Sequence, residues 1–117
     1  MEYIESVTPH IPSKNIKESV NFMAEVFGFE PSNHSEVYSE LLSGNHILGI
    51  IQAHGEPNQQ SIYLRVKDVD ALWSKIKSKL EKVKHKAPFN QDYGMREIHV
   101  VIPETNTLLF IGSPTNS

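Results

Sequence analysis

Apolar residues recur along residues 16–27 at the three- and four-residue spacing of an amphipathic helix. The stripe has four members: Ile16, Val20, Met23 and Phe27. Asn15 stands just before it as a suitable N-cap, and Gly28 follows where a left-handed backbone commonly ends a helix. The pattern therefore predicts a helix over residues 16–27.

A second helical stripe lies in the other half of the chain. Its members again recur every three or four positions: Val69, Leu72, Ile76 and Leu80. Asp68 precedes them and can cap the helix by accepting a backbone hydrogen bond. We therefore expect a helix that starts at Val69 and extends to Leu80.

Short apolar segments between breaker residues predict strands. In the first half they cover residues 37–42 and 46–52, joined by a turn at Gly44-Asn45, and residues 8–12 are expected to be extended. In the second half they cover residues 61–66, 95–102 and 107–111. The segments around Pro31 and Pro88 are interpreted as loops.

The two halves repeat one another. Lys14-Asn15-Ile16 and Lys67-Asp68-Val69 match at an offset of 53 residues, each between an extended segment and a helical stripe. The repeat indicates an α+β fold, with the order β-α-β-β-β twice and helices outside curved sheets. The most polar segment, residues 54–60, separates the modules, about 1–56 and 57–117, within one 117-residue domain.

Composition and charge argue against several classes of protein. The formal net charge is −3 and there is no cysteine, so a dedicated nucleic-acid binder, a disulfide and a thiolate metal site are not expected. The longest apolar run, residues 47–51, is far shorter than the ~20 residues of a membrane span. The acidic N-terminus lacks the order of a signal peptide, so a cytoplasmic location is expected.

Three motifs, in this order and spacing, resemble the vicinal oxygen chelate superfamily of glyoxalase I, bleomycin-resistance proteins and extradiol dioxygenases. They are the helix from Asn15 to Phe29 with its FGF ending, residues 66–72 (VKDVDAL), and residues 93–97 (YGMRE) followed by residues 103–106. The last motif departs from the family's DPDGN, because Ile102 replaces the Asp and Thr105 replaces the Gly. The resemblance implies an α+β fold of two βαβββ modules whose curled mixed sheets surround a cavity.

The resemblance also implies where a metal would be held in the superfamily's enzymes. Their four ligands are His, Glu or Gln, and the matching positions here are Thr8, Gly49, Ser61 and Leu109. Leucine and glycine offer no donor, and neutral hydroxyls bind such metals poorly. We therefore expect no metal and no other cofactor, although convergence of His10 and His46 is an alternative.

Alternation along strands extends these positions to a set of expected ligand-binding residues. They are His10, Ile47, Gly49, Ile51, Ser61, Tyr63, Arg65 and Leu109, and the motif at residues 93–97 adds Arg96 to them. Thr107 and Ile111 would share the face of Leu109. Arg96 could grip an anionic group or pair with Glu97 or Glu104, and the same side chains could instead simply fill a small barrel.

The sequence favours a metal-free protein that sequesters an aromatic or amphipathic molecule between paired modules, with no catalytic residue. The alternative is a metal-dependent enzyme of the glyoxalase or dioxygenase type with displaced ligands. Family members of the binding type commonly dimerise, so the expected partners are a small organic molecule and a second copy of the chain. Neither a nucleic acid nor a membrane is expected as a partner.

Overall fold

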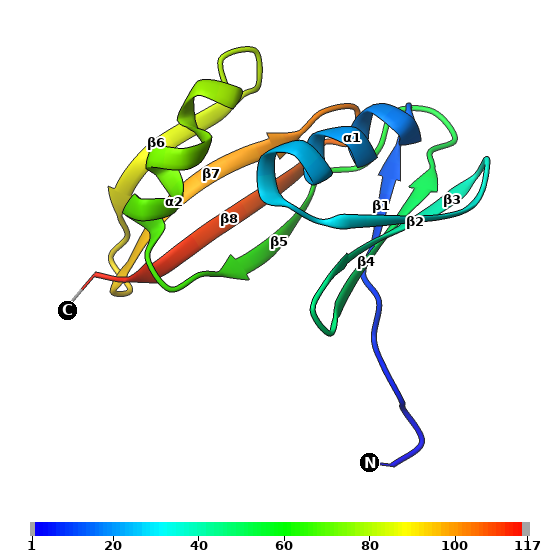
Figure 1. Ribbon diagram of the computed structural model, residues 1–117, viewed down its shortest axis with the longest axis horizontal. Coiled ribbons are helices and arrows are strands. Elements are labelled where there is room, and N and C mark those ends of the chain that lie inside the picture. The colour runs from blue at the N-terminus through cyan, green and yellow to red at the C-terminus, as the bar shows by residue number, and fades with distance from the viewer. Residues whose placement is uncertain (1, 116–117) are drawn as a thin grey trace. The chain divides into compact units, whose positions relative to one another are not determined.

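The computed structural model describes residues 2–115, and the chain divides into two compact units between Pro57 and Asn58. Each unit contains one helix and one four-stranded sheet (Figure 1). None of the helices in the described range is long and apolar enough to cross a lipid bilayer.

The first unit has the order strand, helix and three strands. Its sheet order is β1-β4-β3-β2, with β1 parallel to β4 and the other neighbours antiparallel. The elements are β1 (His10–Ser13), α1 (Ile16–Phe27), β2 (Glu30–Ser35), β3 (Tyr38–Ser43) and β4 (His46–Gln52).

The second unit repeats this arrangement. Its sheet order is β5-β8-β7-β6, again with one parallel pair, β5 with β8. The elements are β5 (Gln60–Arg65), α2 (Val69–Ile76), the 3₁₀ turn η1 (Lys77–Lys79), β6 (His85–Asn90), β7 (Met95–Ile102) and β8 (Thr107–Pro114). The predicted α+β fold of two βαβββ modules is confirmed, with both sheets open.

Local signals set the helix starts as expected. The Asn15 side chain accepts a hydrogen bond from the Glu18 backbone N–H at 3.1 Å, and Asp68 does the same for Ala71 at 3.1 Å. Gly28 ends α1 with φ 74°, a left-handed conformation that costs glycine little. The predicted bounds of α1 are confirmed.

Three elements differ from the sequence-based expectation. The helix α2 ends at Ile76, and η1 then carries the chain to Leu80, which is nevertheless fully buried. The segments around Pro31 and Pro88 form β2 and β6 rather than loops. Both are outer strands, paired on one side only, where the missing proline N–H need not cost a ladder hydrogen bond.

Each helix packs on one face of the sheet of its own unit. In the first unit the core lies between α1 and one face of the sheet. The helix contributes Ile16, Val20 and Met23, and the strands contribute Ile11, Leu41, Leu48 and Ile50. In the second unit the core holds Val69, Ile76 and Leu80 with Ile98, Val100, Ile102, Leu109 and Ile111. Full burial of each such side chain favours folding by about 1.5–3 kcal/mol.

Candidate functional site

The sheet of the second unit has two faces of different chemistry. On the α2 face, the Val69 backbone N–H donates to Ser113 Oγ at 3.0 Å, and alternation places Ile111 on the same side of β8. The opposite face carries polar and aromatic side chains. We call it the polar-aromatic face; its residues are Tyr63, Phe89, Glu97, His99 and Phe110, with Gln91 and Tyr93 reaching over it from the loop before β7.

Glu97 is the centre of the polar-aromatic face. It lies on β7 with no exposed surface, and its two carboxylate oxygens accept four hydrogen bonds. The donors and their distances are Tyr63 Oη at 2.9 Å and Tyr93 Oη at 2.6 Å to Oε2, and Gln91 Nε2 at 3.0 Å and His99 Nε2 at 2.9 Å to Oε1. Four donors replace the water that burial removes.

These contacts shift the pKa values of the groups that make them. Burial by itself raises the pKa of Glu97, but the hydrogen bonds from Tyr93, His99, Gln91 and Tyr63 outweigh it and hold the pKa at about 2. Burial, followed by the bond to Glu97, raises the pKa of Tyr63 to about 12. The bond to Glu97 raises the pKa of Tyr93 to about 12. At neutral pH the cluster therefore holds one carboxylate and two protonated phenols.

Aromatic rings surround this carboxylate. The His99 ring lies 4.2 Å from Phe110 and 4.9 Å from Phe89, centroid to centroid, and Tyr63 lies 6.4 Å from Phe110. Lys86 Nζ lies 3.8 Å above the Phe89 ring, a cation–π contact at the β6 edge. The rings offer apolar area and π-faces against which a flat molecule can pack.

Gly112 makes room for the hydroxyl of Tyr63. It lies opposite Glu97 on β8, and a Cβ atom there would overlap Tyr63 Oη and come within 2.9 Å of Glu97 Cγ. Glycine therefore permits the Tyr63–Glu97 hydrogen bond to form against the β8 backbone.

The first unit has a smaller cluster of the same composition on the sheet face opposite α1. Tyr38 Oη donates to Glu40 at 2.7 Å, and His34 Nε2 lies 3.0 Å from the other carboxylate oxygen. The bond from Tyr38, then that from His34, lowers the pKa of Glu40. The His10 ring lies 5.8 Å from Tyr38, and a Cβ atom at Gly49 would meet both rings.

The structure separates the predicted site residues into three groups. His10, Ile47, Gly49 and Ile51 share the face of the first sheet that carries Glu40, because Gly49 is paired with both His10 and Glu40. Ser61, Tyr63 and Arg65 alternate along β5, and Tyr63 places that series on the polar-aromatic face. Whether any of these residues binds a ligand stays a prediction.

The third group, Arg96 and Leu109, lies on the α2 face, whereas Leu109 is expected from the sequence to share the face of Tyr63. Arg96 Nε donates to both oxygens of Asp70 on α2 at 3.1 Å, and its Nη1 donates to Asn90 at 3.1 Å. Leu109 is fully buried in the α2 core, as are Thr107 and Ile111. The expected register of β8 is wrong by one residue, and Phe110 occupies the face predicted for Leu109.

Sequence reasoning missed Glu97, His99 and Phe110 as site residues. Glu97 was considered only as an ion-pair partner for Arg96, which instead pairs with Asp70. The spacing of two between Glu97 and His99 was the available signal, because it places both on one face of a strand.

The residues do not fit the metal site that the family resemblance implies. Of the four matching positions, Gly49 and Leu109 have no donor side chain, and Leu109 faces α2. Within residues 2–115, no three His, Asp or Glu side chains gather in a way that could hold a metal ion. His99 and Glu97 are bonded to each other, and the other groups on Glu97 are phenols and an amide.

Comparison with known proteins gives one family match. A family model described as "Glyoxalase/Bleomycin resistance protein/Dioxygenase superfamily" matches residues 4–107. No curated protein matches the sequence.

Solved structures share the fold over nearly the whole chain. A bleomycin resistance determinant encoded on the transposon Tn5 is 22% identical, with a TM-score of 0.79 over 97% of this chain and 100% of that one. A bleomycin-binding protein from Streptomyces verticillus, complexed with copper(II)-bleomycin, is 17% identical, with a TM-score of 0.77 over 95% and 97%. Lactoylglutathione lyase from Agrobacterium tumefaciens is 13% identical, with a TM-score of 0.75 over 95% of each chain.

Proposed function

Because the chain belongs to the glyoxalase/bleomycin resistance protein/dioxygenase superfamily, we propose that it is a binding protein for a small organic molecule. The ligand is aromatic or amphipathic, packs on the polar-aromatic face of the second unit, and is sequestered without a chemical step or a metal. The same fold supports unrelated chemistries, so the proposal rests on the site and not on the family alone.

The hydrogen-bonded carboxylate at the centre of that face supports the proposal most directly. Four donors fix Glu97, and Glu97 in turn fixes the orientations of Tyr63, Tyr93 and His99. A site whose side chains are already ordered loses less conformational entropy when a ligand binds. The aromatic rings supply apolar contact area, and the hydroxyls orient a ligand, which is the usual composition of a small-molecule site.

The donor chemistry supports binding over metal catalysis. The superfamily's metal enzymes need His, Glu or Gln at positions that hold Thr8, Gly49, Ser61 and Leu109 in this chain. The carboxylate best placed on the polar-aromatic face, Glu97, already accepts hydrogen bonds on both oxygens. A divalent ion there would have to displace several of these donors.

A ligand screen on the purified protein tests the proposal. Planar and amphipathic metabolites are tested by thermal shift, because a ligand that binds the native state stabilises it by about 2.7 kcal/mol at a hundred times its Kd. For a confirmed ligand, Tyr63→Ala should weaken binding by about 1–3 kcal/mol, through loss of a ring contact and an ordered hydroxyl.

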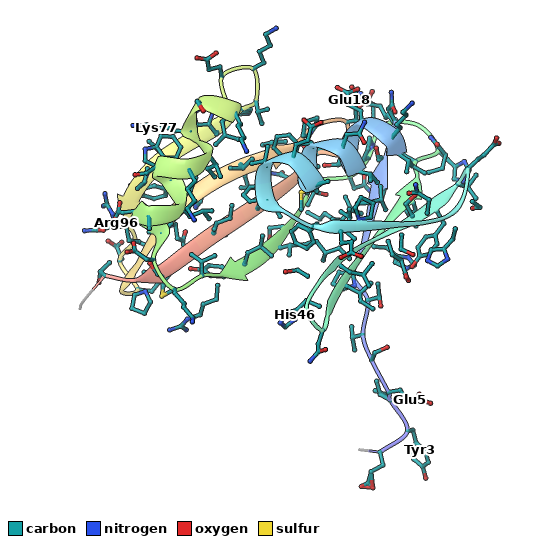
Figure 2. The ribbon with its side chains drawn as sticks, in the orientation of Figure 1. Tyr3, Glu5, Glu18, His46, Lys77 and Arg96 are labelled. Atoms are coloured by element: carbon teal, nitrogen blue, oxygen red, sulfur yellow. The ribbon has the colours of Figure 1, made fainter. Side chains whose placement is uncertain are left out.

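The matched control is Tyr3→Ala, because Tyr3 is 91% exposed and precedes β1 (Figure 2). We expect this variant to bind as the wild type does. Equal binding by Tyr63→Ala and wild type would place the ligand elsewhere. Stoichiometric metal in the purified protein, together with turnover of a thiol adduct or an aromatic diol, would overturn the proposal in favour of a metal-dependent enzyme.

A further inference from the structure

The hydrogen bonds to Glu97 fix the direction in which each neighbour donates. An ionised carboxylate can only accept, so every polar atom bonded to it must supply the proton. Tyr63 and Tyr93 each have a single hydroxyl proton, and both protons point to Glu97 Oε2, at O···O distances of 2.9 and 2.6 Å. Neither hydroxyl has a second proton to donate to a ligand.

What remains on these hydroxyls is acceptor capacity. A phenol oxygen that donates one hydrogen bond still carries lone pairs. Tyr63 is 41% exposed and Tyr93 60% exposed, so both side chains lie partly at the surface. Gln91 donates a hydrogen bond to the Tyr93 oxygen, which leaves one lone pair there for a ligand. His99 donates through Nε2 to Glu97, and an imidazole that donates through one nitrogen can accept through the other when that nitrogen carries no proton.

Positive side chains flank this face without changing the direction of those bonds. Arg65 lies on the same face of β5 as Tyr63, and Lys86 Nζ sits over the Phe89 ring. Arg96 is held on the opposite face by Asp70 and Asn90. Because Glu97, Arg65 and Lys86 all act on a charged ligand, uncharged ligands report the hydrogen-bonding preference most cleanly.

We infer that the polar-aromatic face selects planar ligands that carry N–H or O–H donors, because the hydroxyl groups of Tyr63 and Tyr93 are committed to Glu97 and can only accept. The inference rests on the proposed function and adds the ligand class to it. Glu97 acts as a positioning residue, since it sets the polarity of the tyrosines and does not itself need to touch the ligand.

Indole and quinoline are suitable probes. Both are flat, bicyclic and uncharged at about pH 7, but indole offers one N–H donor whereas quinoline offers one nitrogen acceptor. Each is titrated into ¹⁵N-labelled protein, and the shifts of the β7 and β8 amides locate the site and give Kd. We expect indole to bind about three- to tenfold more tightly, as one net hydrogen bond implies.

Glu97→Gln reverses the direction of the hydrogen bonds. The amide NH₂ of glutamine can donate to Tyr63 Oη and Tyr93 Oη, which frees both hydroxyl protons for a ligand. The preference should then move from indole to quinoline by a similar factor. Glu5→Gln is the matched control, because Glu5 is exposed and precedes β1, and it should keep the wild-type preference.

Tyr93→Phe provides a second readout if Glu97→Gln does not fold. It removes one acceptor and keeps the ring, so the advantage of indole should shrink while quinoline binds as before. Tyr3→Phe should change neither probe. If quinoline binds this face as tightly as indole in the wild type, the inference fails and small-molecule binding stands. If neither probe nor any screened compound binds, the proposed function fails and the inference with it.

Discussion

A carboxylate with no exposed surface is stable in the second unit because its partners supply what water would. Glu97 has four donors on two oxygens, and within residues 2–115 no buried side-chain polar atom lacks a hydrogen-bond partner. Hydrogen bonds to a charged group are each worth about 1.5–3 kcal/mol, and leaving the charge unpaired would cost more. The same hydrogen bonds to Glu97 therefore order the side chains of the candidate site and stabilise the folded chain.

The stability of the protein should fall in acid because of Glu97. Its folded pKa of about 2 lies below the ordinary value of 4.5, so the ionised form stabilises the fold above pH 4.5. This contribution is lost as pH falls from 4.5 towards 2. Urea unfolding at stepped pH should show a steeper loss in the wild type than in Glu97→Gln. Parallel pH profiles for the two proteins would contradict the assignment.

Gly112→Ala should disturb both the fold and the site. The added methyl group would overlap Tyr63 Oη and approach the Arg96 carbonyl oxygen at 3.1 Å, so Tyr63 must move away from Glu97. Such overpacking typically costs about 1–3 kcal/mol. Chemical denaturation measures the loss, and the Tyr63 pKa should drop below its wild-type value of about 12.

Ser61→Ala is the control for Gly112→Ala, because Ser61 is exposed on the same face of β5. Its free energy of unfolding should stay within about 0.5 kcal/mol of the wild type. A Gly112→Ala protein as stable as this control would show that the Tyr63 hydroxyl does not need the space at Gly112.

Sequence reasoning placed Tyr63 on the correct strand but left out the residues it contacts. Alternation from Ser61 reached Tyr63 directly, whereas residues 108–111 of β8 are all apolar and fall on both faces of the strand. An uninterrupted apolar run does not reveal which residues face which side. The turn before it decides the register: Glu104 and Asn106 both take left-handed φ values, 72° and 57°, which the sequence pattern does not report.

At the scale of whole elements, the helix starts and the end of α1 were predictable because their signals are local, whereas the end of α2 was not. Both N-caps and the Gly28 ending of α1 follow from residue types at fixed offsets. The strands β2 and β6 were not predictable from the sequence, because they are mostly exposed and contain Pro31 and Pro88. Their extended form comes from pairing with β3 and β7, a tertiary effect that local pattern cannot show.

Removal of either cap should destabilise its helix. Asn15→Ala and Asp68→Ala each remove a 3.1 Å hydrogen bond to a free backbone N–H, which typically costs about 1 kcal/mol. Thermal unfolding measures the effect, with Lys17→Ala in the exposed part of α1 as a control that should change little. An unchanged melting temperature for both cap variants would mean that solvent satisfies these amides equally well.

At the scale of the whole molecule, we expect association into a two-fold dimer. Ile4 and Val7 are 65% and 79% exposed, and they lie in an extended segment before β1 (Figure 1). Exposed apolar residues together with outer strand edges favour contact with a second copy. Sedimentation at micromolar concentration should give twice the 13.3 kDa chain mass.

Substitution of the exposed residues tests the source of the association. Serine at positions 4 and 7 together should raise the fraction of the 13.3 kDa species without lowering the melting temperature of the monomer. A wild-type protein that sediments only at 13.3 kDa would refute the dimer.

The confinement of strand pairing to each half has a consequence for how the chain folds. Across residues 2–115, every paired strand has its neighbours inside its own unit. Even the parallel partners β1 and β4 are therefore closer in sequence than the length of one unit. The contact order is therefore lower than in a sheet assembled from both ends of the chain, and rapid folding is the expected result. On the ribosome, the first half can complete its hydrogen-bond ladder while the second is still being synthesised, so none of its described strands waits unpaired for a partner from the other half.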